Sequence, residues 1–374
     1  MPEIGTSLLH MTRDHSDKMK ATMEAQRIRR YFEKDTANFR YMQMLGNGIS
    51  NVACKVKYRN RWWRHRPATQ IFVVKRPFRS GSAAAIQNEV QCLRVFKGAM
   101  HIVQPIYFDD GFKNPIDDAP GTTIILEYLG NGSLWKFSRR MRASREEELP
   151  NRLLYRVFMC LTRAIIAMAY PPQGNTPDGA VVIERIPTEQ ILRAAKRNIV
   201  HGDMHANNIL FGDFQPDAFE HALMPPLKLI DLERAEVLHQ TPTSGLYPGV
   251  EENIYKIGRS MRSIIAIGWP AADSYVSVDN DLSPILSCAQ FPAEDFPNLD
   301  RELADLIVRC CARYVDDRPS LEDVHTRVLD GIMKPAGYYS TYARGHVETD
   351  THIKELIRTR LLDADTAGGS SSSS

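Results

Sequence analysis

Two short segments near the middle of the chain place acidic and amide side chains in a fixed order. The first contains Asp203 and, five residues later, Asn208. The second is the mostly apolar run 227–230, which ends at Asp231. An Asp, an Asn and a second Asp, with a strand-like segment before the last, match the way in which a phosphoryl-transfer site assembles its base and its magnesium ligands. No other feature constrains the chain as much, because three polar side chains must be brought together by one loop and one following strand.

The composition is that of a globular chain. Of the 374 residues, 43% are apolar and 25% are charged, and this length allows two packed lobes. The 47 basic and 45 acidic residues leave a formal net charge of only +2. No global electric field therefore favours nucleic acid or a membrane surface, and we expect neither as a partner.

The cysteines and the apolar runs suggest where such a chain resides. The cysteines are scattered without the spacing of a metal site, and no signal-peptide pattern opens the chain. No apolar run approaches the roughly 20 residues that span a bilayer. We expect reduced core thiols and a cytoplasmic or nuclear location. The six cysteines are Cys54, Cys92, Cys160, Cys288, Cys310 and Cys311.

The first third of the chain alternates short strand patterns with one helical pattern. Residues 1–38 are polar and charged, with a helix expected over 18–34, and are interpreted as an N-terminal extension. Residues 39–129 are predicted to form a small β-rich lobe and its connection to the next lobe. Within it, strands are expected over 39–45, 52–58, 71–74 and 122–128, and a helix over 83–96.

Helical patterns dominate the rest of the chain. Residues 130–335 are predicted to form a larger, mainly helical lobe, with a long apolar helix over 152–170. The stretch 171–198 carries Pro, Gly and Asp early and is interpreted as an insertion. Residues 336–374 are interpreted as a C-terminal extension, whose Gly- and Ser-rich end at 367–374 is expected to be disordered.

Three residues of the first lobe suggest a phosphate-binding site. Gly46 and Gly48 lie between two predicted strands, where glycine lets the backbone approach phosphate oxygens. The same sequence is also ordinary hairpin-turn chemistry. Lys75 ends a buried-looking strand, although such a lysine is often only a solvated charge. Glu89 lies on the apolar face of the next helix, where a carboxylate needs a cationic partner. Lys75 is the expected partner, and the alternatives are a partner elsewhere or a carboxylate that reaches solvent.

Together these segments resemble the eukaryotic-type protein kinase superfamily, from about residue 39 to residue 329. The segment 316–320, Asp-Asp-Arg-Pro-Ser, is a rather specific part of the match. The resemblance implies an α+β protein with a bilobal protein-kinase-like fold, in which a small β-rich lobe with one helix precedes a larger, mainly helical lobe. It also implies ATP and Mg²⁺ as cofactors.

By this resemblance, most of the nucleotide-binding residues lie in the first lobe. Lys75 would hold the α- and β-phosphates, and Glu89 would anchor Lys75. The carbonyl of Glu127 and the amide of Leu129 would meet the adenine edge at the hinge. The full predicted nucleotide-binding set is Leu45, Gly46, Gly48, Val52, Lys75, Glu89, Glu127, Leu129 and Asp231.

The same resemblance assigns the catalytic roles. Asp203 would orient the attacking hydroxyl group or accept its proton, while Asn208 and Asp231 would bind magnesium. The predicted catalytic set is completed by Lys75 and by His205, which occupies the position at which serine/threonine kinases usually carry a phosphate-contacting lysine.

Several positions depart from the family pattern. Asn51 replaces the third glycine of the phosphate-covering loop, which makes that loop less permissive. Leu232 and Glu233 replace the Phe-Gly pair expected after Asp231. Asn253 stands where the central helix of the large lobe usually carries an aspartate, and the segment before it is short.

Three functions therefore stay open at this stage. The first is a divergent protein serine/threonine kinase that acts on a protein hydroxyl group. The second is a small-molecule kinase, because residues 201–205 also resemble aminoglycoside and choline phosphotransferases, which phosphorylate small hydroxyl compounds. The third is a pseudokinase that binds nucleotide or partners without transfer, which the replacements at Asn51, Glu233 and Asn253 favour. The acceptor and the oligomeric state do not follow from the sequence.

Overall fold

The computed structural model of the protein describes most of the chain and divides it into two units. The described residues are 3–48, 50–59, 69–79, 83–106, 123–143, 148–172, 181–191, 196–215, 217–238, 248–266, 274–278 and 284–364. Unit 1 comprises residues 1–97, 103–128 and 232–234, and unit 2 comprises residues 98–102, 129–231 and 235–374. The Ser-rich tail predicted at 367–374 and parts of the predicted insertion at 171–198 lie outside the described residues.

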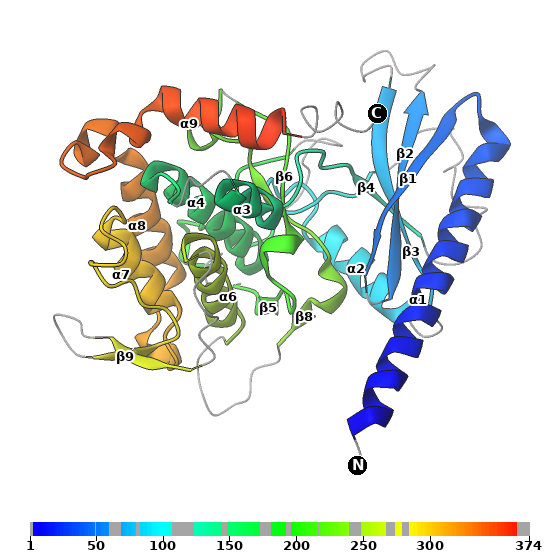
Figure 1. Ribbon diagram of the computed structural model, residues 1–374, viewed down its shortest axis with the longest axis horizontal. Helices are drawn as coiled ribbons and strands as arrows, with labels where there is room; N and C mark the ends of the chain where they lie inside the picture. Colours follow the sequence, from blue (N-terminus) through cyan, green and yellow to red (C-terminus); the bar gives the residue numbers. More distant parts are fainter. Residues whose placement is uncertain are drawn as a thin grey trace. The chain divides into compact units, whose positions relative to one another are not determined.

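Unit 1 contains a four-stranded antiparallel sheet in the order β1-β2-β3-β4 (Figure 1). In β2, Val52, Cys54, Val56 and Tyr58 are buried at every second position, which is the pattern of a strand with one face on a core. The elements are β1 (Phe39–Asn47), β2 (Asn51–Arg59), β3 (Thr69–Pro77), β4 (Ile124–Glu127) and the helix α2 (Ala83–Val95). The four strands and the helix predicted for this region are confirmed, with β4 shorter than expected.

The long helix α1 (Glu3–Phe32) packs on this sheet and supplies part of its core (Figure 1). Ala21, Ala25, Ile28 and Phe32 are buried, and their spacing of three or four positions places them on one helix face. An ion pair of 3.0 Å between Arg76 Nε and Glu24 Oε1 joins β3 to α1. Residues interpreted as an N-terminal extension thus form part of the core of unit 1.

Unit 2 is built around α4 (Asn151–Ala169), a helix that is buried along its whole length. The helix α8 (Leu321–Met333) approaches it so closely that a Cβ atom on Gly331 would lie 2.0 Å from Cε1 of Tyr155, so this position requires glycine. The other α-helices of unit 2 are α3 (Leu134–Ala143), α6 (Pro248–Ile265), α7 (Arg301–Cys310), α8 (Leu321–Met333) and α9 (Asp350–Ile357).

Short strand pairs and single helical turns complete the described structure. The pairs are antiparallel: β5 (Ile199–Val200) with β8 (Glu236–Val237), β6 (Ile209–Phe211) with β7 (Leu227–Leu229), and β9 (Val276–Val278) with β10 (Ile285–Ser287). The turns are η1 (Glu33–Asp35), η2 (Ala206–Asn208), η3 (Phe219–His221), η4 (Leu232–Arg234), η5 (Val315–Asp317), η6 (Ala336–Tyr339), η7 (Gly345–Glu348) and the π-helical η8 (Arg358–Leu362). No helix among the described residues has the length and apolar character needed to cross a membrane.

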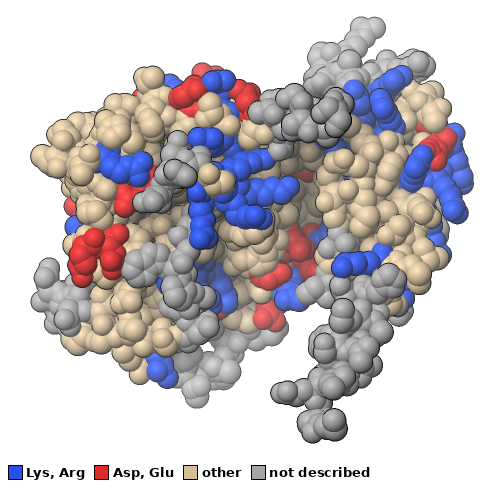
Figure 2. Space-filling view, viewed as in Figure 1, with Lys and Arg blue, Asp and Glu red and all other residues tan. Residues whose placement is uncertain are grey.

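The helix α3 carries a basic outer face. Leu134, Phe137 and Met141 are buried, whereas Arg139 and Arg142 are exposed. Figure 2 shows Lys and Arg side chains gathered over the region of unit 2 in which α3 lies in Figure 1. Basic charge is therefore concentrated locally in unit 2 although the whole chain is nearly neutral.

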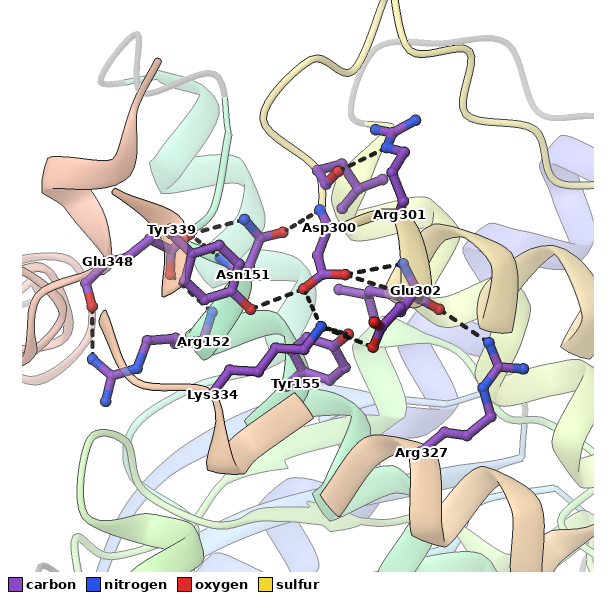
Figure 3. A network of polar contacts seen from close by, with 12 residues as sticks. Asn151, Arg152, Tyr155, Asp300, Arg301, Glu302, Arg327, Lys334, Tyr339 and Glu348 are labelled. Carbon is purple, nitrogen blue, oxygen red and sulfur yellow. Dashed lines mark hydrogen bonds and ion pairs between the residues drawn. The ribbon is translucent and has the colours of Figure 1, made fainter. Parts of the chain in front are cut away.

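A network of buried polar groups ties the residues after α8 to the first turn of α4 (Figure 3). Glu348 accepts hydrogen bonds from the backbone N–H groups of Asn151 (2.7 Å) and Arg152 (3.0 Å), and so caps α4. Asp300 caps α7 through the N–H of Glu302 (2.9 Å). The carboxylate of Asp300 also accepts a hydrogen bond from Tyr339 Oη (3.0 Å) and pairs with Lys334 Nζ (2.7 Å). The described part of the predicted C-terminal extension is thus anchored in unit 2.

The structure bears on the predicted fold class and on the predicted state of the cysteines. The mixed α+β class is confirmed, with a small antiparallel sheet and many helices. All six cysteines are free thiols; five are buried, and Cys92 is half-buried.

Candidate active site

The predicted ion pair between Lys75 and Glu89 is confirmed in unit 1. Lys75 lies in β3, paired with Ala53 of β2 and Ile124 of β4, so the sheet fixes its backbone on both sides. Its Nζ atom lies 2.7 Å from Oε2 of Glu89, and the side chains are 12% and 0% exposed. A buried carboxylate thus holds a nearly buried ammonium group in place at the middle of the sheet.

The turn between β1 and β2 carries the two predicted loop glycines. The N–H of Gly48 donates to the carbonyl of Asn51 (2.9 Å), which closes the hairpin, and Val52 is buried beneath it. A Cβ atom on Gly46 would meet no atom of the described residues within 4 Å, and one on Gly48 would meet only the Asn51 carbonyl at 3.9 Å. Packing among the described residues therefore does not require glycine at either position. Leu45, also predicted to bind nucleotide, is exposed.

Glu233, which the sequence marked only as a departure, holds this hairpin. Its carboxylate accepts hydrogen bonds from Ser50 Oγ (3.1 Å) and from Asn51 Nδ2. Its backbone carbonyl accepts a third bond from Asn88 Nδ2 of α2 (3.2 Å). The residue therefore joins η4 to the glycine hairpin and to the helix that carries Glu89.

We expect the Glu233→Ala variant to loosen the glycine hairpin. The variant leaves the donor group of buried Asn51 without its partner, which should lower the free energy of unfolding by about 1–3 kcal/mol. Hydrogen exchange of the Gly48 amide should become faster, as measured by mass spectrometry of peptides covering the hairpin. The control is Glu236→Ala, at an exposed position on β8. Equal exchange in both variants would show that Glu233 does not restrain the hairpin.

The polar residues predicted to carry the chemistry in unit 2 lie close together. Asn208 Nδ2 donates to the backbone carbonyl of Asp203 (3.0 Å) and lies 3.5 Å from its Oδ2 atom. His205 Nε2 lies 3.6 Å from Oδ1 of Asp203. The side chains of Asp203 and His205 are 30% and 48% exposed, so both are accessible. This geometry brings together the Asp, the His and the Asn that the sequence predicted.

The β6–β7 hairpin links the segment that ends at Asp231 to this loop. Ile209 pairs with Leu229, and the N–H of Ile230 donates to the carbonyl of Asn208 (3.0 Å). Asp231 itself has φ = 66°, a left-handed conformation that is unfavourable for a residue with a side chain. Such strain costs about 1–3 kcal/mol and is found mainly at functional sites.

His201, to which the sequence assigned no role, supports the loop from within. The ring is buried; Nε2–H donates to the carbonyl of Ile230 (3.0 Å), and Nδ1 accepts from the N–H of Asp203 (3.3 Å). Burial lowers the pKa of His201 to about 4, so the ring is neutral near pH 7. The neutral ring connects the segments that carry Asp203 and Asp231.

Asn253 of α6 holds the same loop from the other side. Its Oδ1 atom accepts a bond from the N–H of His201 (3.2 Å), and its Nδ2 atom donates to the carbonyl of Ile199 (2.8 Å). An aspartate could not donate the second bond. The asparagine that replaces the expected aspartate at position 253 is therefore fully buried, and both polar atoms of its amide are hydrogen-bonded.

We expect His201 to make the protein sensitive to acid. Because the pKa is lower in the folded chain than the ordinary value of 6.5, the unfolded chain binds more protons between pH 6.5 and 4, and stability falls as the pH drops through that window. The loss for this group should be on the order of 3 kcal/mol. In urea titrations at pH 7 and pH 4.5, the His201→Gln variant should lose less stability than the wild type. The exposed His346→Gln control should behave as the wild type, and an unchanged pH dependence in His201→Gln would contradict this role.

The predicted hinge residues lie at the change from unit 1 to unit 2, which follows residue 128. Glu127 ends β4; its N–H donates to the carbonyl of Gln104 (3.0 Å), and its Oε1 atom accepts from the N–H of Gln104 (2.7 Å). The side chain of Leu129 is buried. The backbone of Glu127 is therefore fixed at the end of the sheet.

The residues predicted to form one site divide between the two units. Lys75, Glu89 and the glycine hairpin belong to unit 1, whereas Asp203, Asn208 and Asp231 belong to unit 2. No protein-family model matches the chain, and no curated protein matches it. Functional assignment thus depends on the chemistry of these side chains.

The unit 2 residues have the donor set of a magnesium site. Mg²⁺ prefers carboxylate and carbonyl oxygens. The amide nitrogen of Asn208 is bound to Asp203, which leaves the amide oxygen as the atom able to bind a cation. The carboxylate of Asp231 is a second oxygen group able to bind a cation, and one backbone hydrogen bond, from residue 230 to Asn208, links the two segments.

Proposed function

We propose that the protein is an ATP-dependent phosphotransferase with a bilobal protein-kinase-like fold, and most specifically a divergent protein serine/threonine kinase. The observation that carries the proposal is the Asp203, Asn208 and Asp231 constellation, in which Asn208 bonds both to Asp203 and to the residue before Asp231. The Lys75–Glu89 pair of unit 1 is the second support.

Phosphoryl transfer depends more on correctly positioned charged groups than on covalent catalysis by the protein. The reason is that negative charge spreads over the oxygens of the phosphoryl group in the transition state. Magnesium would supply charge neutralisation at the phosphates, held by Asn208 and Asp231. Lys75 would bind phosphate oxygens, and Glu89 keeps its ammonium group in position. The glycines of the hairpin would let its backbone come close to the phosphates.

Asp203 would act on the acceptor. Its half-exposed carboxylate can orient a hydroxyl group and accept the proton that leaves as the new P–O bond forms. His205, 3.6 Å away, is close enough to help orient that carboxylate. The bonds of His201 and Asn208 to the Asp203 backbone fix the loop before any substrate binds.

A nucleotide-binding protein without transfer activity is the second candidate, and the contacts of Glu233 favour it. This carboxylate occupies donor groups of Ser50 and Asn51 in the hairpin that would otherwise face a phosphate. In this case ATP would bind in a different manner or with low affinity. A small-molecule kinase differs from the main proposal only in the acceptor.

One set of measurements tests these possibilities. The full chain is incubated with γ-labelled ATP and Mg²⁺ in the presence of a peptide library or a panel of small hydroxyl compounds, and unfolding temperatures are recorded with ATP alone and with ATP and Mg²⁺. Label transfer to peptides supports the proposal, and transfer only to small compounds supports the small-molecule kinase. Magnesium-dependent stabilisation without any transfer supports the second candidate. Neither stabilisation nor transfer would overturn all three.

A further inference from the structure

A cluster of two histidines and one cysteine lies inside unit 2, and the proposed phosphotransferase chemistry does not use it. His101 precedes the parallel bridge between Ile102 and Leu229, Cys160 lies in α4, and His221 ends η3. All three side chains are buried. Three separate segments of the chain thus meet at one buried point.

The possible ligand atoms of these residues converge. His101 Nε2 and His221 Nε2 lie 3.2 Å apart. One ring nitrogen of each histidine and the Cys160 sulfur all lie within 4.8 Å of one another. Zinc binds imidazole nitrogen at about 2.0–2.1 Å in a tetrahedral arrangement, which places two such nitrogens roughly 3.3 Å apart. The observed separation of the two nitrogens therefore matches a shared metal ion.

An outer layer of polar groups orients the cluster. Glu184 Oε2 lies 2.6 Å from His101 Nδ1, and Oε1 of the same carboxylate accepts from the backbone N–H of His101 (2.8 Å). Arg163 donates to the backbone carbonyl of Glu184 and pairs with Glu220, next to His221. A carboxylate on the far nitrogen of a histidine is the usual support of a metal-binding imidazole, because it fixes the tautomer and the ring orientation.

We infer that His101, Cys160 and His221 bind one zinc ion, with Glu184 as the positioning residue for His101. Two imidazoles and a thiolate are ligands that zinc accepts, and a fourth position would be filled by water. The thiolate and the Glu184 carboxylate together balance the two positive charges of the ion, which a buried site requires. The ion would join α4 to η3 and to the segment 98–102, whose His101 carbonyl also accepts the N–H of Leu229 in β7.

The competing arrangement is a shared proton. Without metal, one proton between the two Nε2 atoms would satisfy both atoms, and the Cys160 sulfur would only make a hydrogen bond with His101. The two arrangements differ in metal content and in the role of the sulfur, and both can be measured on the full chain.

The experiment determines metal content in protein purified without a metal-affinity tag, equilibrated with zinc and dialysed. The wild type should retain about one zinc per chain. Cys160→Ser and His221→Gln should lose most of it, whereas Cys288→Ser, which removes a buried thiol elsewhere in unit 2, should retain it. Wild-type protein free of zinc, or equal zinc in the wild type and Cys160→Ser, would overturn the inference and support the shared proton.

Two further readouts do not depend on the folding of the ligand variants. Cobalt substituted into the wild type should show a thiolate-to-metal charge-transfer band and tetrahedral d–d bands. The absence of the thiolate band would remove Cys160 from the site. Glu184→Gln should retain zinc with affinity lowered by about 10- to 100-fold in a chelator competition. Unchanged affinity would show that Glu184 does not position the ligand. Neither readout involves ATP, so failure here is distinguishable from failure of the proposed phosphotransferase activity.

Discussion

Replacing Asp203 with Asn is expected to lower the rate of γ-phosphate transfer by a factor of about 10² to 10⁴. The amide is nearly the same size as the carboxylate, and the bond from Asn208 goes to the backbone carbonyl of residue 203, which the variant keeps. The loop should therefore retain its structure. What the variant lacks is a group that accepts the proton of the attacking hydroxyl.

The measurement is label transfer from γ-labelled ATP under conditions where the wild type is active, together with the unfolding temperature in ATP and Mg²⁺. Because Asp203 is not a proposed magnesium ligand, nucleotide-dependent stabilisation should persist in the variant. Asp213→Asn, at an exposed position soon after β6, serves as the control and should keep full activity. A variant at residue 203 that transfers phosphate at the wild-type rate would remove Asp203 from the catalytic role.

Regular patterns in the sequence predicted the local structure of both units. The alternation around Val56 predicted β2, because a strand with one face on a core must bury every second side chain. The position of Glu89 on an apolar helix face predicted a cationic partner, because burying an unpaired carboxylate has a large unfavourable free energy. The first rule needs only neighbouring residues, and the second needs only one helix face and a lysine on the strand before it, which is why both predictions succeeded.

Contacts between distant polar residues could not be predicted in the same way. His201 and Asn253 are 52 positions apart, and Glu233 bonds to residues more than 180 positions away. A hydrogen bond between two such side chains leaves no periodic signal, so Glu233 and Asn253 appeared only as departures from a pattern. Only the fold shows that both are hydrogen-bonded within their units.

The cluster of His101, Cys160 and His221 shows most clearly that contacts between distant residues cannot be predicted from sequence patterns. His101 and His221 are separated by 120 positions, and no short spacing of the kind that marks zinc motifs connects them to Cys160. The sequence therefore indicates only core thiols at these positions. A metal site assembled from three separate elements can be recognised only after the fold has brought those elements together.

The Asp300→Ala variant should have the largest effect on stability, about 3–5 kcal/mol. The side chain is 1% exposed and serves three partners at once: the first turn of α7, Lys334 and Tyr339. Loss of a helix cap alone costs about 1 kcal/mol. The larger part should come from Lys334 and Tyr339, whose contacts with Asp300 are drawn in Figure 3. Without this acceptor, Lys334 would stay half-buried and Tyr339 buried.

Chemical unfolding of the full chain measures this loss, and two variants separate its causes. Asp300→Asn keeps an oxygen able to cap α7 but removes the charge, so it should cost less than Asp300→Ala. Asp295→Ala, at an exposed position in the loop before α7, should cost less than about 0.5 kcal/mol. Because Lys334 also lies 2.9 Å from Glu302, this second carboxylate can hold part of the ammonium charge. If Asp300→Ala lowers the free energy of unfolding by no more than the loss of the helix cap, then Glu302 and water replace the contacts of Asp300 with Lys334 and Tyr339. In that case Glu348 and apolar packing hold the residues after α8.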